Sequence, residues 1–128
     1  MCIRDRHKIT PYFTIHKADA FIEFMAAIFD AKVIKLARFD DGKVQHARLK
    51  IDDSIIMLNE ATETYPANSS QMHIYVHSVQ QTYDIAIAKK CLSLMQPMMR
   101  PHGNVMAGFK DPFGNRWWIA EASPQQAL

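Results

Sequence analysis

Cysteine and glycine are both scarce in this chain, and their scarcity argues against several kinds of site. Only Cys2 and Cys91 are present among 128 residues, too few and too far apart for a disulfide framework or a zinc site. Cys91 ends an apolar helical stretch, so we expect it to be a buried core thiol. The four glycines all fit turns, and no glycine-rich loop that could cradle a phosphate is predicted.

An excess of charge of one sign and long hydrophobic runs are also missing. The formal net charge is only +2 and the basic residues are scattered, so no nucleic-acid-binding surface is expected. No apolar run approaches the roughly 18 residues of a membrane span. Residues 1–7 lack the apolar stretch of a signal peptide, and we interpret them as a leader outside the fold. The composition is that of an ordinary globular protein, which we expect to be cytoplasmic.

The sequence repeats in outline at an offset of 61 residues without gaps. Pairs related by this offset include Ile15 and Val76, His16 and His77, Ala27 and Ala88, and Glu60 and Glu121. Identities are few, but the types of predicted element agree along the whole register. The repeat predicts two modules, about 9–60 and 70–121, in a single domain spanning 8–121. Polar residues 61–70 would link the modules, and 122–128 would form a tail.

Each module is predicted to contain one strand, one helix and three further strands. The strands are predicted at 9–15, 33–39, 44–51 and 54–59, then at 71–76, 92–95, 105–110 and 115–120. The apolar helix faces are Phe21, Phe24, Met25, Ile28 and Phe29 in the first module and, displaced by about one residue, Val79, Tyr83, Ala86 and Ile87 in the second. Asp19 and Ser78 are expected to cap the helices. Pro97 is assigned to a loop, and Asp111–Gly114 to the last hairpin turn.

Strand alternation then sorts side chains between two faces. The predicted fold is α+β, with two βαβββ modules forming a curved mixed sheet around a cavity and the helices outside. Residues expected to face the helices are Phe13, Ile15, Leu49, Ile51, Ile56, Leu58, Ile74, Val76, Trp117 and Ile119. Residues expected to face the cavity are Thr10, Tyr12, His46, Arg48, Met57, Asn59, Gln71, His73, Tyr75, Arg116 and Trp118. A polar and aromatic inner face is typical of a ligand pocket.

These residues resemble a known family. The stretches that carry the resemblance are Ile9–Tyr12, Ala20–Phe29, His46–Leu49, Met106–Gly108 and Asp111–Trp118. Together they resemble the PhnB-like branch of the vicinal-oxygen-chelate superfamily, which includes glyoxalases, bleomycin-resistance proteins and extradiol dioxygenases. The resemblance covers about residues 8–121, implies the fold described above, and implies a homodimer.

Enzymes of that superfamily hold a divalent metal through the first and last strands of each module. Carried over by position, the resemblance places the four ligands at Thr10, Met57, Gln71 and Trp118. A hydroxyl, a thioether, an amide and an indole form a poor set for a catalytic dication, which prefers imidazole, carboxylate or thiolate. We therefore expect no metal at these positions and no other cofactor.

Two histidines and two arginines are candidate site residues. His46 and His73 are the candidates for acid–base chemistry or for a displaced metal site, unless each simply bonds a neighbour in the groove. Arg48 and Arg116 could bind a carboxylate or phosphate bidentately, unless they pair with Glu60, Asp53 or Glu121. The aromatic candidates for stacking on a flat ligand, or for simply filling the groove, are Tyr12, Tyr75, Phe109 and Trp118.

We expect a binding site for a small organic ligand, and the identity of any catalytic residue stays open. The candidate ligand-binding residues are Tyr12, His46, Arg48, Met57, Gln71, His73, Tyr75, Arg116 and Trp118. Three alternatives remain at this point. One is a metal-dependent lyase or isomerase of the glyoxalase type that uses His46 and His73. The others are a drug-sequestering protein of the bleomycin-resistance type and a metal-free acid–base enzyme.

Overall fold

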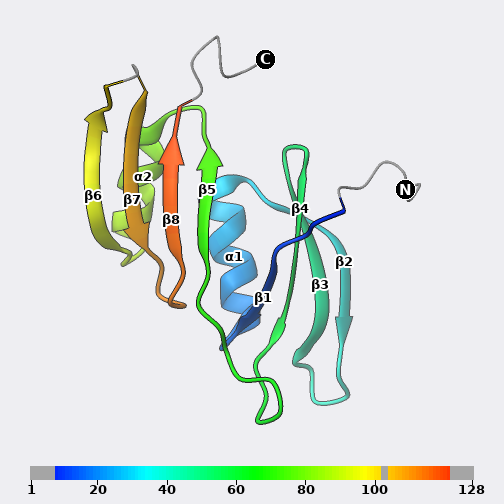
Figure 1. Cartoon of the computed structure of the whole chain (residues 1–128). Coiled ribbons are helices and arrows are strands. Elements are labelled where there is room, and N and C mark those ends of the chain that lie inside the picture. Colours follow the sequence, from blue (N-terminus) through cyan, green and yellow to red (C-terminus); the bar gives the residue numbers. More distant parts are fainter. Residues whose placement is uncertain (1–7, 102–103, 122–128) are drawn as a thin grey trace. The chain divides into compact units, whose positions relative to one another are not determined.

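The computed structural model describes residues 8–101 and 104–121, and these form two compact units that divide between Asn68 and Ser69. Each unit is one predicted module, a four-stranded mixed sheet with one helix (Figure 1). The elements of unit 1 are β1 (Tyr12–Ile15), α1 (Ala18–Phe29), β2 (Lys32–Arg38), β3 (Val44–Ile51) and β4 (Ser54–Glu60). Those of unit 2 are β5 (Gln71–Tyr75), α2 (Val79–Ala88), β6 (Leu92–Met99), β7 (Val105–Lys110) and β8 (Arg116–Ala120). The predicted α+β class and βαβββ order are confirmed.

Both sheets have the same strand order. It is β1-β4-β3-β2 in unit 1 and β5-β8-β7-β6 in unit 2, and the first strand of each unit runs parallel to the last. The other neighbours pair antiparallel. The predicted leader 1–7 and tail 122–128 lie outside the described residues. No helix in the described part of the chain is long and apolar enough to cross a membrane.

The core of each unit lies between its helix and one face of its sheet. In unit 1, Phe13, Leu49 and Leu58 are fully buried beneath α1, whose own buried side chains include Phe21 and Met25. Unit 2 buries Trp117, Phe109 and Ile119 on the face that α2 covers. Each such side chain contributes about 1.5–3 kcal/mol by leaving water. The predicted assignment of helix-facing residues is confirmed for most positions, with Ile51, Ile74 and Val76 only half-buried.

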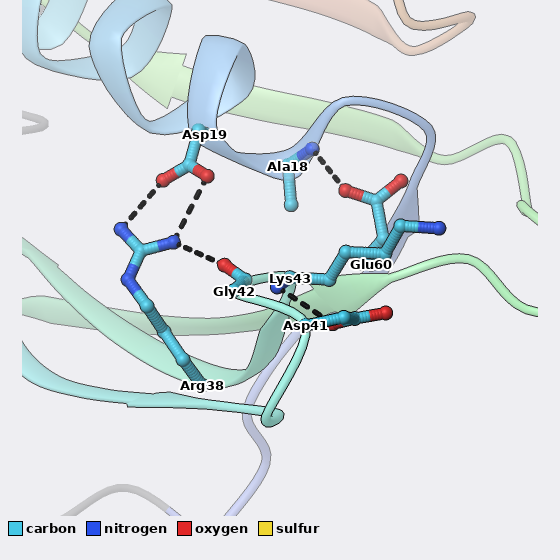
Figure 2. A network of polar contacts seen from close by, with 7 residues as sticks. All are labelled: Ala18, Asp19, Arg38, Asp41, Gly42, Lys43 and Glu60. Atoms are coloured by element: carbon cyan, nitrogen blue, oxygen red, sulfur yellow. Dashed lines mark hydrogen bonds and ion pairs between the residues drawn. The ribbon is translucent and has the colours of Figure 1, made fainter.

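Glutamates far away in the sequence stabilise both helix starts. The Glu60 carboxylate at the end of β4 accepts a hydrogen bond from the backbone N–H group of Ala18 at 2.9 Å (Figure 2). It also accepts one from the N–H group of Lys17, likewise at 2.9 Å. In unit 2, Glu121 accepts from the Val79 N–H at 2.9 Å. An anion at a helix N-terminus satisfies unpaired donors and favours the helix dipole. Ser78 also caps α2, as predicted, by accepting from Gln81 N–H at 3.2 Å.

Asp19 is not the helix cap that the sequence predicted. Its carboxylate instead receives two hydrogen bonds from the Arg38 guanidinium, at 2.8 and 3.0 Å. The same guanidinium donates to the Gly42 carbonyl at 2.8 Å, and so ties the start of α1 to the β2–β3 hairpin (Figure 2). The bond from Arg38 holds the pKa of Asp19 below its usual value. Asp19 is the second residue of α1, so it lies inside the first turn rather than at the cap position before the helix.

The repeat is not gap-free, and this corrects one face assignment. Asp30 and Lys90, which follow the two helices, both have the positive φ of the left-handed region, and they lie 60 rather than 61 positions apart. The end of α2 is therefore one residue shorter than the repeat predicts. The sheet pairings Ala47 with Leu58 and Ala107 with Ile119 then show that one residue is regained in the last turn. A shift of one residue turns a strand's side chains to the opposite face. Phe109 is therefore fully buried toward α2 rather than available to a ligand.

The prediction for the second helix is confirmed at Val79 and Ala86, and it is wrong at Tyr83 and Ile87. The helix's buried residues are Val79, Thr82 and Ala86, which follow Ala18, Phe21 and Met25 at the original offset. Its apolar face is therefore not displaced. Ile87 is 39% exposed, and the half-buried Tyr83 donates its hydroxyl hydrogen to Ser93 Oγ at 2.6 Å.

Several predicted boundaries move by a few residues. β1 begins at Tyr12 rather than residue 9, and β6 continues to Met99 through Pro97, which the sequence assigned to a loop. Proline lacks an N–H donor, but β6 is an edge strand and its pairing with β7 is irregular between Met95 and Met98. Asp111 fixes the last turn by accepting from the N–H groups of Phe113 and Asn115.

Candidate functional site

The face of the second sheet that points away from α2 carries a shallow, open groove. Its lining residues come from β5, β7 and β8, and its volume is about 420 Å³. They are Gln71, Met72, His73, Met106 and Trp118. Three of these, Gln71, His73 and Trp118, were predicted from strand alternation. Methionine side chains adapt their shape to a ligand, so the lining suits an apolar or aromatic group.

A hydrogen bond between Trp118 and Gln71 defines the floor of the groove. The Trp118 indole N–H donates to Gln71 Oε1 at 2.8 Å. Gly108 lies opposite Trp118 in the β7–β8 ladder, and the indole packs directly over it. A Cβ added at Gly108 would lie 2.5 Å from Trp118 Cε3 and closer still to Cζ3. Gly108 is therefore not the turn glycine that the sequence suggested, because it makes room for the indole.

Other polar and aromatic groups follow the same face of unit 2. His73 and Tyr75 are both exposed and meet edge to face, with ring centroids 5.0 Å apart. Arg116 is exposed at the start of β8, beside Gln71 in the ladder. Glu121, one of its expected partners, is engaged at the α2 N-terminus instead. This face therefore presents hydrogen-bonding groups around an aromatic and thioether surface.

The corresponding face of unit 1 has a different chemistry. Tyr12 Oη and His46 Nδ1 lie 3.4 Å apart, and their ring centroids are 6.0 Å apart. Burial lowers the pKa of His46, and the nearby cations Arg48 and Lys35 lower it further. Because its imidazole is more readily kept neutral, His46 is suited to accept a proton or hydrogen bond near neutral pH.

Arg48 and Asn59 bring buried polar atoms to this face of unit 1. Arg48 on β3 lies opposite Met57 on β4, and Asn59 follows Met57 by two residues on the same side of the strand. Arg48 Nε and Asn59 Oδ1 are both buried, and neither has a hydrogen-bond partner among the described residues. The suggested pairing of Arg48 with Glu60 is not formed, since that carboxylate binds the start of α1.

The positions that the resemblance assigned to metal ligands do not suit a divalent metal. In unit 2, the amide oxygen of Gln71 is already bonded to the indole of Trp118, which has no lone pair to offer a metal. In unit 1, Met57 supplies a thioether, and Thr10 supplies a neutral hydroxyl just before β1. Within residues 8–101 and 104–121, no group of three or more His, Cys, Asp and Glu side chains could hold a metal ion. No step of a reaction can therefore be derived through a metal at these positions.

Comparison with known proteins agrees with this architecture. The family model described as the glyoxalase/bleomycin resistance protein/dioxygenase superfamily matches residues 12–119. The chain belongs to this superfamily. Among its relatives is the uncharacterized protein Mb0911c of Mycobacterium bovis, 24% identical over 94% of this chain and 87% of the relative.

Solved structures of other proteins share the fold at low identity. TioX from Micromonospora sp. ML1 is 15% identical with a TM-score of 0.73, covering 91% of this chain and 97% of its own. The PhnB protein from Bacillus cereus is 19% identical with a TM-score of 0.71, covering 91% of this chain and 100% of its own. At such identities the likeness concerns the fold, and function must be argued from the side chains.

The structure groups the predicted site residues by unit. The first sheet brings together Tyr12, His46, Arg48 and Met57, and the second brings together Gln71, His73, Tyr75, Arg116 and Trp118. Their ligand-binding role stays a prediction. Lys35 and Gly108 were missed as site residues, and only the β2–β3 pairing and the correct β7 register could have revealed them.

Proposed function

We propose that this protein is a PhnB-like, small-molecule-binding member of its superfamily that works without the usual catalytic dication. The observation that carries the proposal is the hydrogen bond between Trp118 and Gln71. It joins two of the four positions that hold the metal in related enzymes and leaves an indole where a charged ligand would be needed. A dication beside these neutral groups would be poorly compensated in a partly buried site.

The ligand we propose is a small, flat organic molecule that lies in the groove of unit 2. Trp118 and Met106 offer a polarizable apolar surface, while His73 offers a hydrogen bond. The open form of the groove favours reversible binding over enclosure of a reaction. This arrangement also supports a drug-sequestering protein of the bleomycin-resistance type, which needs an aromatic-lined groove and no catalytic group.

The metal-dependent lyase or isomerase has less support. Within residues 8–101 and 104–121, neither His46 nor His73 belongs to a group of three or more His, Cys, Asp and Glu side chains that could hold a metal ion. Elemental analysis of protein freed of its purification tag tests this point. We expect substoichiometric zinc, nickel, iron and manganese, and no change in Tm with a chelator. One tightly held equivalent that disappears in His46→Ala or His73→Ala would overturn the proposal.

Ligand binding is tested by a thermal-shift screen of small aromatic compounds on the full chain. A compound that raises Tm should lose at least about fivefold in affinity in Trp118→Leu, since stacking on an aromatic ring contributes roughly 1 kcal/mol or more. Tyr65→Leu is the matched control, because Tyr65 is 66% exposed and outside the groove. Equal loss in both variants, or no compound that binds, would contradict the proposal. The homodimer and the cytoplasmic location stay predictions.

A further inference from the structure

Two buried polar atoms on the first sheet lack partners within the described chain. Arg48 Nε is a donor that carries part of a full positive charge, and Asn59 Oδ1 is an acceptor. Leaving such atoms buried and unpaired is costly, so in native proteins they usually meet water or a ligand. Arg48 and Asn59 are diagonal neighbours on adjacent strands, within reach of one small molecule.

The charge of this face indicates what kind of molecule would bind. Its described side chains include Tyr12, Thr14, Lys35, His46, Arg48, Lys50, Met57 and Asn59, and none of these is acidic. Lys35 lies directly opposite Arg48 in the β2–β3 pairing, so two cations stand side by side. Both lower the pKa of His46, which is the electrostatic effect expected of a positive surface. Such a face attracts an anion and repels an ammonium group.

Unit 2 shows that the fold itself does not require these polar residues. Where Arg48 faces Met57 in unit 1, Gly108 faces Trp118 in unit 2. The position of Asn59 corresponds there to the buried Ala120. Because the same framework forms with glycine and alanine at these positions, a purely structural need does not account for the unpaired guanidinium and amide.

We propose that this face of unit 1 binds a small organic anion with a neutral hydrogen-bond donor beside the anionic group, such as a 2-hydroxy carboxylate. Arg48 would hold the carboxylate through Nε and a terminal nitrogen, and Asn59 Oδ1 would accept from the hydroxyl group. A 2-amino acid fits less well, because its ammonium group would lie beside Arg48 and Lys35. The inference rests on the proposed function only in assuming that the protein binds small molecules, since the residues differ from those of the groove.

Nuclear magnetic resonance of the ¹⁵N-labelled full chain tests the inference directly, because the Arg48 Nε–Hε group gives its own signal. Arg48→Lys identifies that signal by its loss. The probes are lactate, propionate, which lacks the hydroxyl, and methyl lactate, which lacks the charge. We expect lactate to shift the Arg48 signal saturably, propionate to bind about tenfold more weakly, and methyl lactate to leave the signal unchanged.

Substitutions then separate the two halves of the site. Asn59→Leu should lower the affinity for lactate to the affinity that the original protein has for propionate. The affinity of the variant for propionate should be the same as that of the original protein. Arg100→Lys, at an exposed arginine of unit 2 that belongs to neither candidate site, is the matched control and should leave lactate binding unaltered. A lactate effect no larger than that of sodium chloride, or equal shifts from all three probes, would overturn the inference. If groove compounds still bind in that case, the proposed function stands and only the unit 1 site is refuted.

Discussion

Replacing Gly108 with alanine adds a single methyl group at the most crowded point of the candidate groove. Gly108 is buried, and its φ is outside the positive region, so its backbone accepts alanine without strain. The new Cβ, however, would lie 2.5 Å from Trp118 Cε3 and 3.3 Å from Cη2. Real Cβ atoms do not approach other atoms so closely, so the indole must move. A displaced indole loses its bond to Gln71.

The expected cost follows from two opposing effects. Alanine loses less backbone freedom than glycine on folding, which by itself would stabilise the protein by about 0.4–1 kcal/mol. Overpacking a well-filled site costs about 1–3 kcal/mol, and a displaced hydrogen bond adds about 1 kcal/mol. The clash therefore dominates, and we expect Gly108→Ala to lower the free energy of unfolding by about 1–3 kcal/mol. For a chain of this size the Tm should fall by about 5–10 °C.

Urea unfolding followed by circular dichroism measures this change, and a double-mutant cycle assigns its cause. If the indole is responsible, Gly108→Ala should be far less destabilising when Trp118 is already leucine, with a coupling energy of about 1 kcal/mol or more. Gly42→Ala is the comparison variant, because that position is open but has a φ of 90° and suffers only backbone strain. A Gly108→Ala protein as stable as the original, with an unmoved Trp118 indole N–H signal, would refute the packing described here.

Three further predictions follow from single residues. The pKa of His46 in the folded protein lies below its ordinary value, so below about pH 6.5 the unfolded chain binds more protons than the folded one, and the free energy of unfolding should fall as the pH falls. His46→Gln should make the free energy of unfolding, measured by urea titration, depend less on pH in this range. An unchanged pH dependence in the variant would contradict this prediction. Burial, with a contribution from Asp111, raises the pKa of the Cys91 thiol to about 12. Ellman's reagent at pH 8 should therefore label Cys91 only when urea unfolds the protein. The assay uses the Cys2→Ser variant, in which Cys91 is the single cysteine. Glu60→Gln should cost about 0.5–2 kcal/mol in unfolding free energy by weakening the α1 N-terminus, whereas exposed Glu63→Gln should cost little; equal effects would argue against the cap.

The sequence predicted the strands and their faces best where apolar and polar side chains alternate. Along β4, for example, Ile56 and Leu58 are buried whereas Met57 and Asn59 are only half-buried, so both the strand and its register could be found from sequence. In β7, by contrast, Ala107, Gly108 and Phe109 are all buried. Three consecutive buried residues do not alternate, so the face of each side chain could not be predicted from this stretch. The residue that α2 lacks is made up in the turn between β7 and β8, and nothing in the composition of that turn indicates the extra residue.

The helix ends illustrate a second reason for failure. Asp19 was the expected cap because rules for helix termini consider only nearby residues. The actual donors and acceptors lie 42 and 43 positions apart, on a strand that only the folded sheet brings to the helix. A signal was nevertheless present, because Glu60 and Glu121 align in the internal repeat. Their shared role explains why a glutamate stands at the end of the last strand in both modules.

The two units therefore use one framework for two different chemistries. Where the helix-facing side must fill a core, both modules keep large apolar residues, as at Leu58 and Ile119. On the opposite face, packing imposes no such limit, and the paired positions differ in kind. Arg48 beside Met57 makes a cationic, hydrogen-bonding surface, whereas Gly108 beside Trp118 makes an aromatic one. We propose that this division of charge and aromaticity between the two copies lets one copy bind an anionic group and the other a flat ring.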